Sequence, residues 1–143
     1  MIEIRLAQQE EDMRNIFFIR KKVFVDEQHV DPLLEFDGLD GKAEHVVMFF
    51  DEKPVGCARL RFIGGKAKLE RVAVLKDYRG RGLGKAIVEF LVDYCKKRGM
   101  REVYLHSQLP VRGFYAKCGF VERGTMFVEA DIKHIEMFKD LEI

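Results

Sequence analysis

The stretch that decides the fold is Val72-Ala73-Val74-Leu75-Lys76-Asp77-Tyr78-Arg79-Gly80-Arg81-Gly82-Leu83-Gly84-Lys85, residues 72–85. Its first part is apolar and rich in β-branched residues, which is typical of a strand. Leu83, Ile87 and Leu91 then recur at helical spacing until Gly99 ends the helix. The basic, glycine-rich turn therefore precedes a helix N-terminus, where backbone N–H groups lack acceptors and the helix dipole favours negative charge. The pattern predicts an anion site, most simply for phosphate.

Two common phosphate-binding motifs do not fit this turn. A P-loop requires Gly-x-x-x-x-Gly-Lys-Ser/Thr, but Arg79 replaces the first glycine and Ala86 replaces the hydroxyl that would bind Mg²⁺. The dinucleotide pattern Gly-x-Gly-x-x-Gly begins at Gly80 and Gly82, but Lys85 stands where the third glycine belongs. A basic turn whose glycines serve only tight packing is the structural alternative.

The pattern that does match is Arg/Gln-x-x-Gly-x-Gly/Ala, present as Arg79, Gly82 and Gly84 between a Val-rich strand and an amphipathic helix. With these residues the sequence resembles the GNAT superfamily of N-acetyltransferases. The resemblance implies that the turn holds the pyrophosphate of acetyl-CoA, which serves as cosubstrate. The predicted cofactor-binding residues are Val72, Ala73, Val74, Arg79, Gly80, Arg81, Gly82, Leu83, Gly84, Lys85, Ser107, Phe114 and Lys117.

A second segment supports this resemblance. Residues 114–120, Phe-Tyr-Ala-Lys-Cys-Gly-Phe, resemble the Phe-Tyr-x-x-x-Gly-Phe segment of the family. The resemblance implies that Tyr115 protonates the departing thiolate of CoA. A phenol of pKa about 10 beside a nascent thiolate of pKa about 8.5 can stabilise it by a hydrogen bond or by proton donation. A half-buried packing role for Tyr115 is the alternative.

A finer resemblance points to one branch of the family. Residues 20–28 (RKKVFVDEQ), 37–40 (DGLD), His45 and 129–137 (EADIKHIEM) look like the small bacterial ElaA/YjcF-like branch. Arginine followed by Val-Phe is also similar to the acyl-homoserine-lactone synthases, relatives of the same fold. The shorter chain and the complete Arg-x-x-Gly-x-Gly turn favour an enzyme that uses CoA.

The composition is that of one ordinary globular domain, residues 1–143. The net charge is +1, which does not indicate binding to nucleic acid or to an anionic membrane surface. Three scattered cysteines suggest reduced thiols in a cytoplasmic protein, and their spacing does not indicate a metal site. No stretch is apolar over the ~18 residues that a membrane span needs.

The order of the expected elements is that of an α+β protein with a mixed, mostly antiparallel sheet flanked by helices. Short connections make the strands at 44–50, 55–62 and 67–75 antiparallel. A right-handed crossover through the helix that starts at Leu83 makes the strand at 102–106 parallel to the strand before the turn. The remaining elements are expected as a strand at 2–6, a helix starting near Glu10, a short helix at 111–117, and strands at 120–122, 125–129 and 132–138, with turns at Gly124 and Asp131. This order matches the GNAT architecture along essentially the whole chain.

Three residues are predicted to contact the acceptor: Arg20, Glu27 and His134. Arg20 falls on the apolar stripe of the first helix, where a guanidinium either snorkels to solvent or serves a site. Glu27 belongs to an acidic group with Asp31, Glu35, Asp37 and Asp40 that either forms a negative rim for a cationic amine or consists of solvated loop charges.

The proton of the attacking amine needs an acceptor, because freeing the lone pair of a lysine-like amine at pH 7 costs about 4.6 kcal/mol. Glu70 is the first candidate, since it is expected on the same face of its strand as Val72 and Val74. It could equally pair with a neighbouring arginine. Glu129, His134 and Glu136 are rivals, and His134 has the natural pKa for the task.

Two further contacts are implied by the family alone. In the family a backbone N–H at the splay of the fourth strand polarises the thioester carbonyl, and Val74 or a neighbour would donate it here. Ser107, together with Leu105, His106 and Gln108, could contact pantetheine. The asparagine that family members often carry nearby is absent between His106 and Phe120.

The sequence therefore predicts an acetyl-CoA-dependent N-acetyltransferase that acts on a primary amine of a small molecule or peptide by direct attack in a ternary complex. The alternatives are a non-catalytic acyl-CoA-binding or regulatory module and an enzyme like the acyl-homoserine-lactone synthases. The last strand of this fold could pair across a homodimer.

Overall fold

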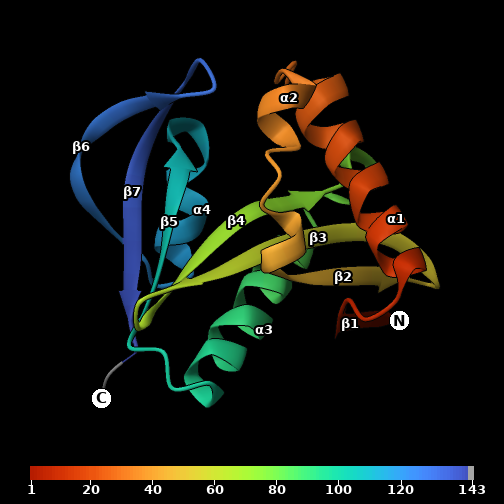
Figure 1. Ribbon diagram of the computed structural model, residues 1–143, viewed down its shortest axis with the longest axis horizontal. Helices are drawn as coiled ribbons and strands as arrows, with labels where there is room; N and C mark the ends of the chain where they lie inside the picture. Colours follow the sequence, from red (N-terminus) through yellow and green to blue (C-terminus); the bar gives the residue numbers. More distant parts are fainter. Residues whose placement is uncertain (142–143) are drawn as a thin grey trace.

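The sheet at the centre of the molecule has seven strands in the order β1-β2-β3-β4-β5-β7-β6. It is seen in a computed structural model that describes residues 1–141. The strands are β1 (Ile2–Leu6), β2 (Glu44–Phe50), β3 (Lys53–Ile63), β4 (Lys66–Val74), β5 (Glu102–Gln108), β6 (Val121–Glu129) and β7 (Ile132–Asp140). The helices are α1 (Glu10–Arg20), η1 (Lys21–Glu27), α2 (Pro32–Glu35), η2 (Asp40–Lys42), η3 (Lys76–Tyr78), α3 (Leu83–Lys97), η4 (Leu109–Val111) and α4 (Arg112–Lys117). The predicted α+β fold, with its mixed and mostly antiparallel sheet, is confirmed (Figure 1).

Strands β4 and β5 are the parallel pair in this sheet. Strands β1 to β4 pair antiparallel in chain order, and β7 pairs antiparallel with both β5 and β6. Strands β4 and β5 are joined through α3 and run parallel, as the right-handed crossover predicted. Their ladder ends where Leu69 lies opposite Leu105. Beyond that pair the two strands diverge, which is visible in Figure 1.

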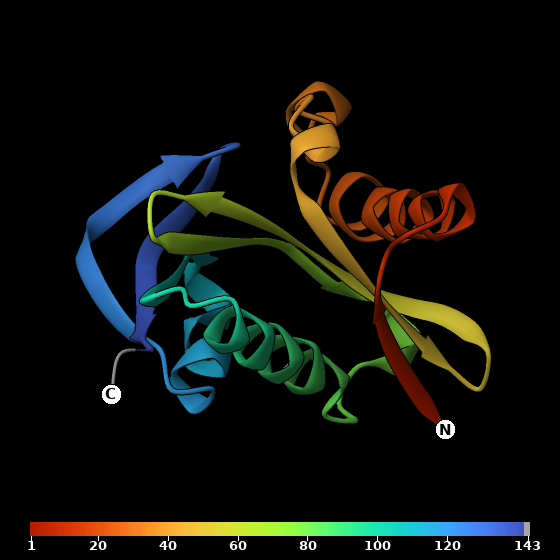
Figure 2. The same ribbon diagram turned by 60° about the horizontal axis from the view of Figure 1, so that its bottom comes forward.

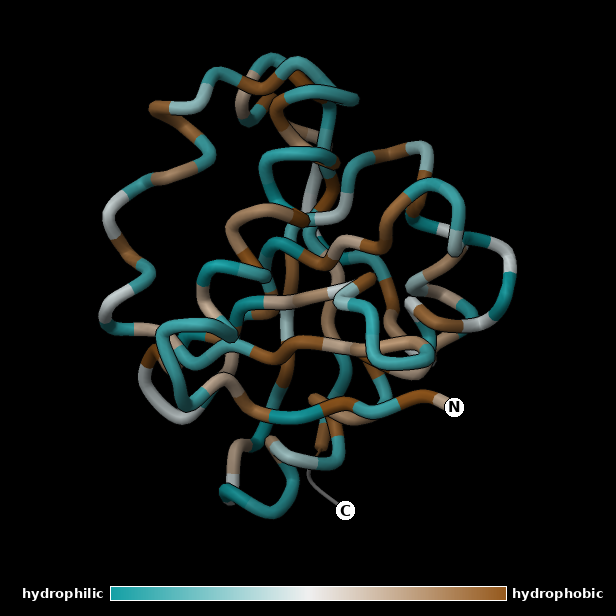
Figure 3. The backbone as a smooth tube through the Cα atoms, turned by 90° about the vertical axis from the view of Figure 1, so that its right-hand side faces the viewer, coloured by the Kyte–Doolittle hydropathy of each residue, from teal (hydrophilic) through white to brown (hydrophobic). Residues whose placement is uncertain are grey.

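Helices cover both faces of the sheet. Figure 2 shows α3 on one face and α1 on the other. The larger core, under α3, includes Leu69, Ile87 and Leu91, and the smaller core, under α1, includes Ile16 and Ile19; none of these side chains is more than 2% exposed. In Figure 3 hydrophobic and hydrophilic segments alternate along the strands and helices, as expected for elements with one buried face.

The cysteines are free thiols. Burial raises the pKa of Cys57 and of Cys95 to about 12, so both stay protonated inside the two cores. None of the helices within residues 1–141 combines the length and the apolar character that crossing a bilayer requires.

A bulge at Arg71 interrupts β4. Arg71 has a positive φ of 56°, and the register with β3 changes from Glu70 opposite Arg59 to Ala73 opposite Cys57. β4 therefore has one more residue than β3 across this interval. Because side chains alternate between the two faces of a strand, an extra residue exchanges the faces of everything that follows it.

The bulge changes where Glu70 points. Leu69 before the bulge and Val72 and Val74 after it all pack on the core under α3. Glu70, between them, lies on the α1 face beside Arg59. The expectation that Glu70 shares a face with Val72 and Val74 is therefore wrong, and the extra residue at the bulge is the reason.

Strand β6 differs from the prediction in a related way. The turn expected at Gly124 is wrong, because β6 continues through it as one strand, Val121–Glu129. Gly124 has a φ of 80°, and the register with β7 shifts between Arg123 and Phe127. The glycine thus makes a bulge within the strand, since it adopts positive φ at little cost. The turn predicted at Asp131 is confirmed, and Ala130 and Asp131 both have positive φ.

Charged side chains form one buried group between the segment 20–40 and strands β3 and β4. The members of this ionic cluster are Arg20, Glu35, Asp37, Asp40, Arg59, Glu70 and Arg71. Arg59 is 0% exposed, and its guanidinium lies 2.8–3.0 Å from carboxylate oxygens of Asp37, Asp40 and Glu70. The cluster ties the segment that follows α1 to the middle of the sheet, because a buried charge that lost its partners would cost several kcal/mol.

Arg20 is fully buried in this cluster. Its Nε and Nη1 lie 2.7 Å from carboxylate oxygens of Glu35 and Asp40, and its Nη2 donates to the backbone oxygen of Glu35. Of the two alternatives for Arg20, snorkelling to solvent is wrong, because internal carboxylates satisfy the guanidinium. Its burial also does not support a contact with an acceptor.

The acidic rim predicted along residues 27–40 is largely neutralised. Glu35, Asp37 and Asp40 belong to the ionic cluster. Asp31 accepts a hydrogen bond from the N–H of Leu33 and so caps α2. These carboxylates are therefore neither a free rim for a cation nor merely solvated loop charges.

The ionic cluster predicts a specific acid sensitivity at Glu70. Burial raises the pKa of Glu70, but hydrogen bonds from Arg61 and the charges of Arg59 and Lys68 outweigh it and bring the pKa from 4.5 to about 2. A depressed carboxyl pKa gives stability that is present above the unfolded pKa and is lost as pH falls toward the folded one. We expect the stability advantage of wild type over Glu70→Gln to shrink by about 2 kcal/mol between about pH 5 and pH 3.

Chemical denaturation at a series of pH values measures this difference. Glu122→Gln on the exposed side of β6 is the matched control, and its difference from wild type should change little over the same range. A Glu70→Gln difference that is independent of pH would contradict the proposed ion pairing.

At Gly56, β3 lies so close to α3 that a side chain would not fit without a shift of its neighbours. A Cβ at Gly56 would lie 2.8 Å from Ile87 Cδ1 and 3.2 Å from the backbone oxygen of Ala73. We expect Gly56→Ala to destabilise the protein by about 1–3 kcal/mol, because the neighbouring backbone cannot yield easily. Gly41→Ala is the control, since a Cβ there meets nothing within 4 Å. Equal unfolding midpoints in denaturant for the two variants would refute this packing constraint.

Candidate active site

The turn that leads into α3 has the geometry of an anion site. Gly80 and Gly82 adopt φ of 79° and 77°, and Gly82 precedes the helix without a side-chain cap. Ala86 is the first residue of the helix whose N–H reaches a helical carbonyl, Gly82 O at 3.1 Å. The N–H groups just before it are left open at the positive end of the helix dipole. A Cβ at Gly80 or Gly82 would meet nothing within 4 Å, so protein side chains do not fill the space over these glycines.

Three predicted cofactor residues from separate elements meet at Gly84. A Cβ at Gly84 would lie 3.2 Å from Phe114 Cζ and 3.9 Å from Val74 Cγ2. The first turn of α3 therefore touches both α4 and the end of β4, and only a glycine allows that approach. Leu83 is buried in the core below, whereas Lys85 is exposed beside the turn.

Arg79 and Glu27, predicted for the cofactor and the acceptor respectively, pair with each other. Nη1 and Nη2 of Arg79 lie 2.6 and 2.9 Å from the two carboxylate oxygens of Glu27. The Nε of Arg79 donates to Val74 O at 2.9 Å. Hydrogen bonds from Arg79 lower the pKa of Glu27. The end of η1 is thus attached to the turn, and the guanidinium is not free.

Tyr115 makes edge-to-face contacts with two phenylalanine rings on the α3 face of the sheet. Its ring centroid lies 5.0 Å from that of Phe114 and 6.0 Å from that of Phe120. Burial raises the pKa of Tyr115, so the phenol stays protonated near neutral pH. Within residues 1–141 its hydroxyl has no hydrogen-bond partner and is not fully enclosed, although most of the side chain is buried. A proton donor with an open hydroxyl therefore lies one residue from Phe114, which touches the turn.

Beyond its last pair with β4, strand β5 carries Ser107 on the core face and Gln108 on the opposite face. Ser107 is buried on the core side, and its hydroxyl donates to Gln108 O, so its side chain is not open to a ligand. Gln108 Nε2 donates to Gln28 Oε1 at 2.8 Å. Because Gln28 follows Glu27, the end of η1 contacts β5 directly and is linked to the end of β4 through Arg79. The sequence did not reveal this bridge, since the two amides lie far apart in the chain.

His106 lies between two carboxylates on the same face of β5. Its Nδ1 is 2.9 Å from Glu129 Oε1, and its Nε2 is 3.3 Å from Glu136 Oε1. Glu136 also accepts from Arg123 at 2.7 Å. The hydrogen bond with His106 is the main cause that lowers the pKa of Glu129. This pairing was also not predicted, because it depends on the register of three strands.

His134 occupies β7 directly opposite Gln108. Its ring stacks on Phe127 with centroids 5.8 Å apart, and its Nδ1 lies 2.7 Å from Ile132 O.

Glu70 is the least suited of the predicted proton acceptors, because Arg59, Arg61 and Lys68 hold its carboxylate ionised with a pKa of about 2. A carboxylate with so low a pKa is a weak base.

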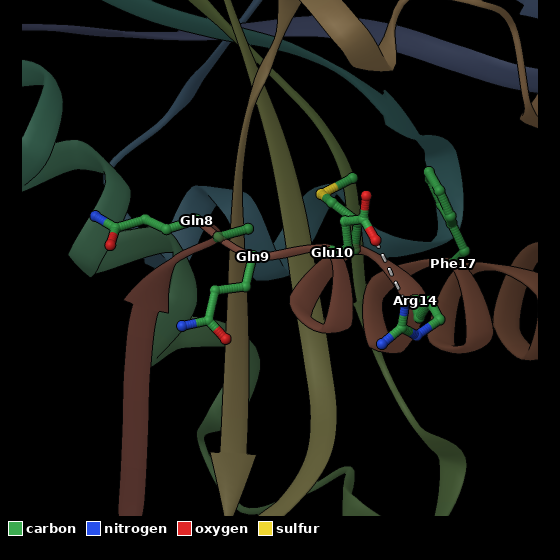
Figure 4. Close-up of a pocket in the computed structure, with 7 residues that line it drawn as sticks. Gln8, Gln9, Glu10, Arg14 and Phe17 are labelled. Atoms are coloured by element: carbon green, nitrogen blue, oxygen red, sulfur yellow. Dashed lines mark ion pairs between the residues drawn. The ribbon is translucent and has the colours of Figure 1, made fainter.

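The hollow in Figure 4 lies at the first turns of α1 and is separate from these residues. Gln8 and Gln9 lie at one side of it and Phe17 at the other, and Glu10 pairs with Arg14 at 3.9 Å. None of the residues that line it belongs to the turn, to α4 or to the end of β5. The chemistry-bearing side chains gather instead around the divergence of β4 and β5.

Comparisons with known proteins agree with this geometry. The model of the acetyltransferase (GNAT) family matches residues 10–120. Protein YyaT of Bacillus subtilis is 38% identical over 143 residues, which covers 98% of this chain and 97% of YyaT. The uncharacterized N-acetyltransferase YjcF of the same organism is 38% identical over 136 residues, with 94% and 97% covered.

Solved structures give the same result. Escherichia coli ElaA superposes with a TM-score of 0.87 at 25% identity, covering 98% of this chain and 100% of ElaA. The PaiA N-acetyltransferase of Thermoplasma acidophilum, solved in complex with coenzyme A, shares the fold with a TM-score of 0.76 at 21% identity, covering 98% and 99%. The chain belongs to the GNAT family of acetyltransferases and is similar to ElaA and YjcF within it.

Proposed function

We propose that this protein transfers the acetyl group of acetyl-CoA to a primary amine of a small molecule or peptide, by direct attack in a ternary complex. The observation that carries the proposal is the open turn at Gly80–Lys85, which ends one strand of a diverging pair and starts a helix. Backbone amides at a helix N-terminus are suited to a diphosphate. A protein with the same fold was solved in complex with coenzyme A, which supports the proposal that this fold binds the coenzyme.

The edge of β4 extends the coenzyme site away from the turn. Beyond Leu69, β4 keeps β3 on one side, while its ladder with β5 has ended. The backbone groups of Val72, Ala73 and Val74 on that edge are therefore suited to pair with the amides of pantetheine, as an added strand would. Arg81 and Lys85 are exposed beside the diphosphate position and add positive charge.

Tyr115 supplies the acid step of the proposed reaction. The amine nitrogen attacks the thioester carbonyl carbon, the C–N bond forms, and the C–S bond then breaks. The leaving sulfur takes a hydrogen bond or a proton from the open hydroxyl of Tyr115. A neutral phenol suits this role because it faces a thiolate only as the bond breaks, so its stabilisation is specific to the transition state.

Binding measurements test the coenzyme site. In isothermal titration we expect acetyl-CoA to bind at least about 100-fold more tightly than S-acetylpantetheine, because the latter lacks the diphosphate that makes the charge-assisted hydrogen bonds. Arg81→Gln should weaken acetyl-CoA binding, whereas Arg14→Gln, an equally exposed arginine on α1, should not. No binding of acetyl-CoA at about 1 mM would remove the proposal.

Tyr115→Phe tests the acid step, because phenylalanine keeps the contacts with Phe114 and Phe120 and removes only the hydroxyl. We expect kcat to fall by about 10²-fold or more, with acetyl-CoA affinity within about twofold of wild type. Thiol release from acetyl-CoA with spermidine, glucosamine, tyramine and a lysine peptide measures turnover. Tyr94→Phe on α3, which loses a hydroxyl that hydrogen-bonds Glu44, is the control. Undiminished turnover in Tyr115→Phe would exclude the acid role.

A further inference from the structure

We infer that His134 accepts, through Nε2, the proton that the attacking amine nitrogen releases, and that the ammonium group of the acceptor is first held beside Glu129. The inference rests on the proposed acetyl transfer and names the residue for its base step. His134 takes the place of Glu70 in the base role, because three cationic side chains keep the Glu70 carboxylate ionised and make it a weak base.

The hydrogen bond of His134 fixes which ring nitrogen carries the proton. Nδ1 lies 2.7 Å from Ile132 O, and a backbone carbonyl can only accept, so Nδ1 must be the donor. If the ring were flipped by 180°, a ring carbon would lie 2.7 Å from Ile132 O, which is closer than the ~3.3 Å of a C–H···O contact. In the neutral ring the lone pair is therefore on Nε2, which is the arrangement that a general base needs.

Nε2 has no protein partner within residues 1–141, and it is not fully enclosed. The residue as a whole is only 7% exposed and stacks on Phe127. The stack and the Nδ1 hydrogen bond therefore hold the ring, while Nε2 keeps an unpaired position.

The position of His134 suits the amine side of the reaction. It lies opposite Gln108, at the end of β5 beyond the divergence from β4, and on the face where Gln108 contacts Gln28 of the α1 side. Tyr115 lies on the other face with the α3 core. An amine and a leaving thiolate occupy different sides of one tetrahedral carbon. His134 and Tyr115 lie on opposite faces of the sheet near the end of the β4–β5 ladder, which matches that requirement.

Neighbouring groups are less suited to accept the proton. Both ring nitrogens of His106 already contact carboxylates, those of Glu129 and Glu136, so neither is free to meet the attacking amine. Glu136 is held by Arg123. Glu129 is half exposed and its charge acts on His134, so it can attract an ammonium toward Nε2. The acceptor class is therefore a primary amine that arrives as a cation.

The proton balance is complete with these residues. The acceptor arrives as R–NH₃⁺ and leaves as the amide R–NH–CO–CH₃, so it loses two protons. One proton goes to solvent before attack, and His134 Nε2 takes the second as the C–N bond forms. The C–S bond breaks, the sulfur takes a proton from Tyr115, and Tyr115 regains one from solvent. His134 releases its proton to solvent, so the reaction yields one proton overall.

The tautomer can be tested without any acceptor. Long-range ¹H–¹⁵N NMR spectra of the ¹⁵N-histidine-labelled protein distinguish a protonated from an unprotonated ring nitrogen. We expect His134 to show a protonated Nδ1 and a free Nε2 at neutral pH. A proton on Nε2 instead would overturn the inference.

The matched substitution for activity is His134→Asn. The side-chain amide of asparagine can keep the hydrogen bond to Ile132 O that Nδ1 makes, while it removes Nε2. We expect kcat for the best amine of the panel to fall at least about 100-fold, with acetyl-CoA binding within about twofold of wild type. Bound acetyl-CoA also shows that the variant is folded. His29→Asn is the control, because His29 is exposed and its φ of 61° suits asparagine.

The pH dependence adds a readout that a structural role would not move. In wild type the rise of kcat with pH should coincide with the titration of His134 in the NMR spectra, and this rise should disappear in His134→Asn. Glu129 of β6 is the charged group that acts on His134, and His106 of β5 and Lys68 of β4 act on Glu129 in turn. Glu136 of β7 contacts His106, so His106→Asn is measured in parallel. Loss of the rise in His106→Asn with its retention in His134→Asn would overturn the inference.

The two proposals fail differently. Thiol release that survives His134→Asn within about threefold overturns this inference and leaves acetyl transfer in place. Acetyl-CoA that does not bind wild type overturns acetyl transfer itself, and the base step with it.

Discussion

Strand β4 has two neighbouring strands as far as Leu69 and one beyond it, and the candidate site depends on that change. A parallel pair whose members diverge leaves backbone groups of both strands without a ladder partner. Near this divergence, Tyr115 lies on one face of the sheet and His134 on the other. The glycine turn at the end of β4 places a helix N-terminus at the same point.

The bulge at Arg71 and the ionic cluster hold this arrangement in place. The bulge directs Val72 and Val74 into the α3 core while Glu70 stays on the α1 face. Arg71 itself reaches back to Glu35, so the residue that makes the bulge also joins the cluster. Buried ion pairs of this kind are costly to break, although they add little stability over apolar packing. Their role here is positional, because they keep the segment after α1 close to β4.

The sequence pattern predicted the parts of the fold that depend on residues close together in the chain. The strand–turn–helix at 72–97 and the parallel crossover to β5 followed from hydrophobic periodicity, the glycines and the short connections. The face of Glu70 and the burial of Arg20 could not be predicted, because each depends on a register or on partners distant in sequence. Periodicity assumes an unbroken strand, so a one-residue bulge is enough to invert it.

The pairing of Arg79 with Glu27 has a consequence for how two ligands would influence each other. The same guanidinium holds Val74 O at the end of β4 and the carboxylate at the end of η1. A coenzyme that drew Arg79 toward its phosphates would release Glu27, and any cationic ligand that drew Glu27 would release Arg79. By thermodynamic reciprocity each ligand would then change the affinity for the other by the same factor. One surface ion pair would thus couple binding at the turn to binding at the end of η1.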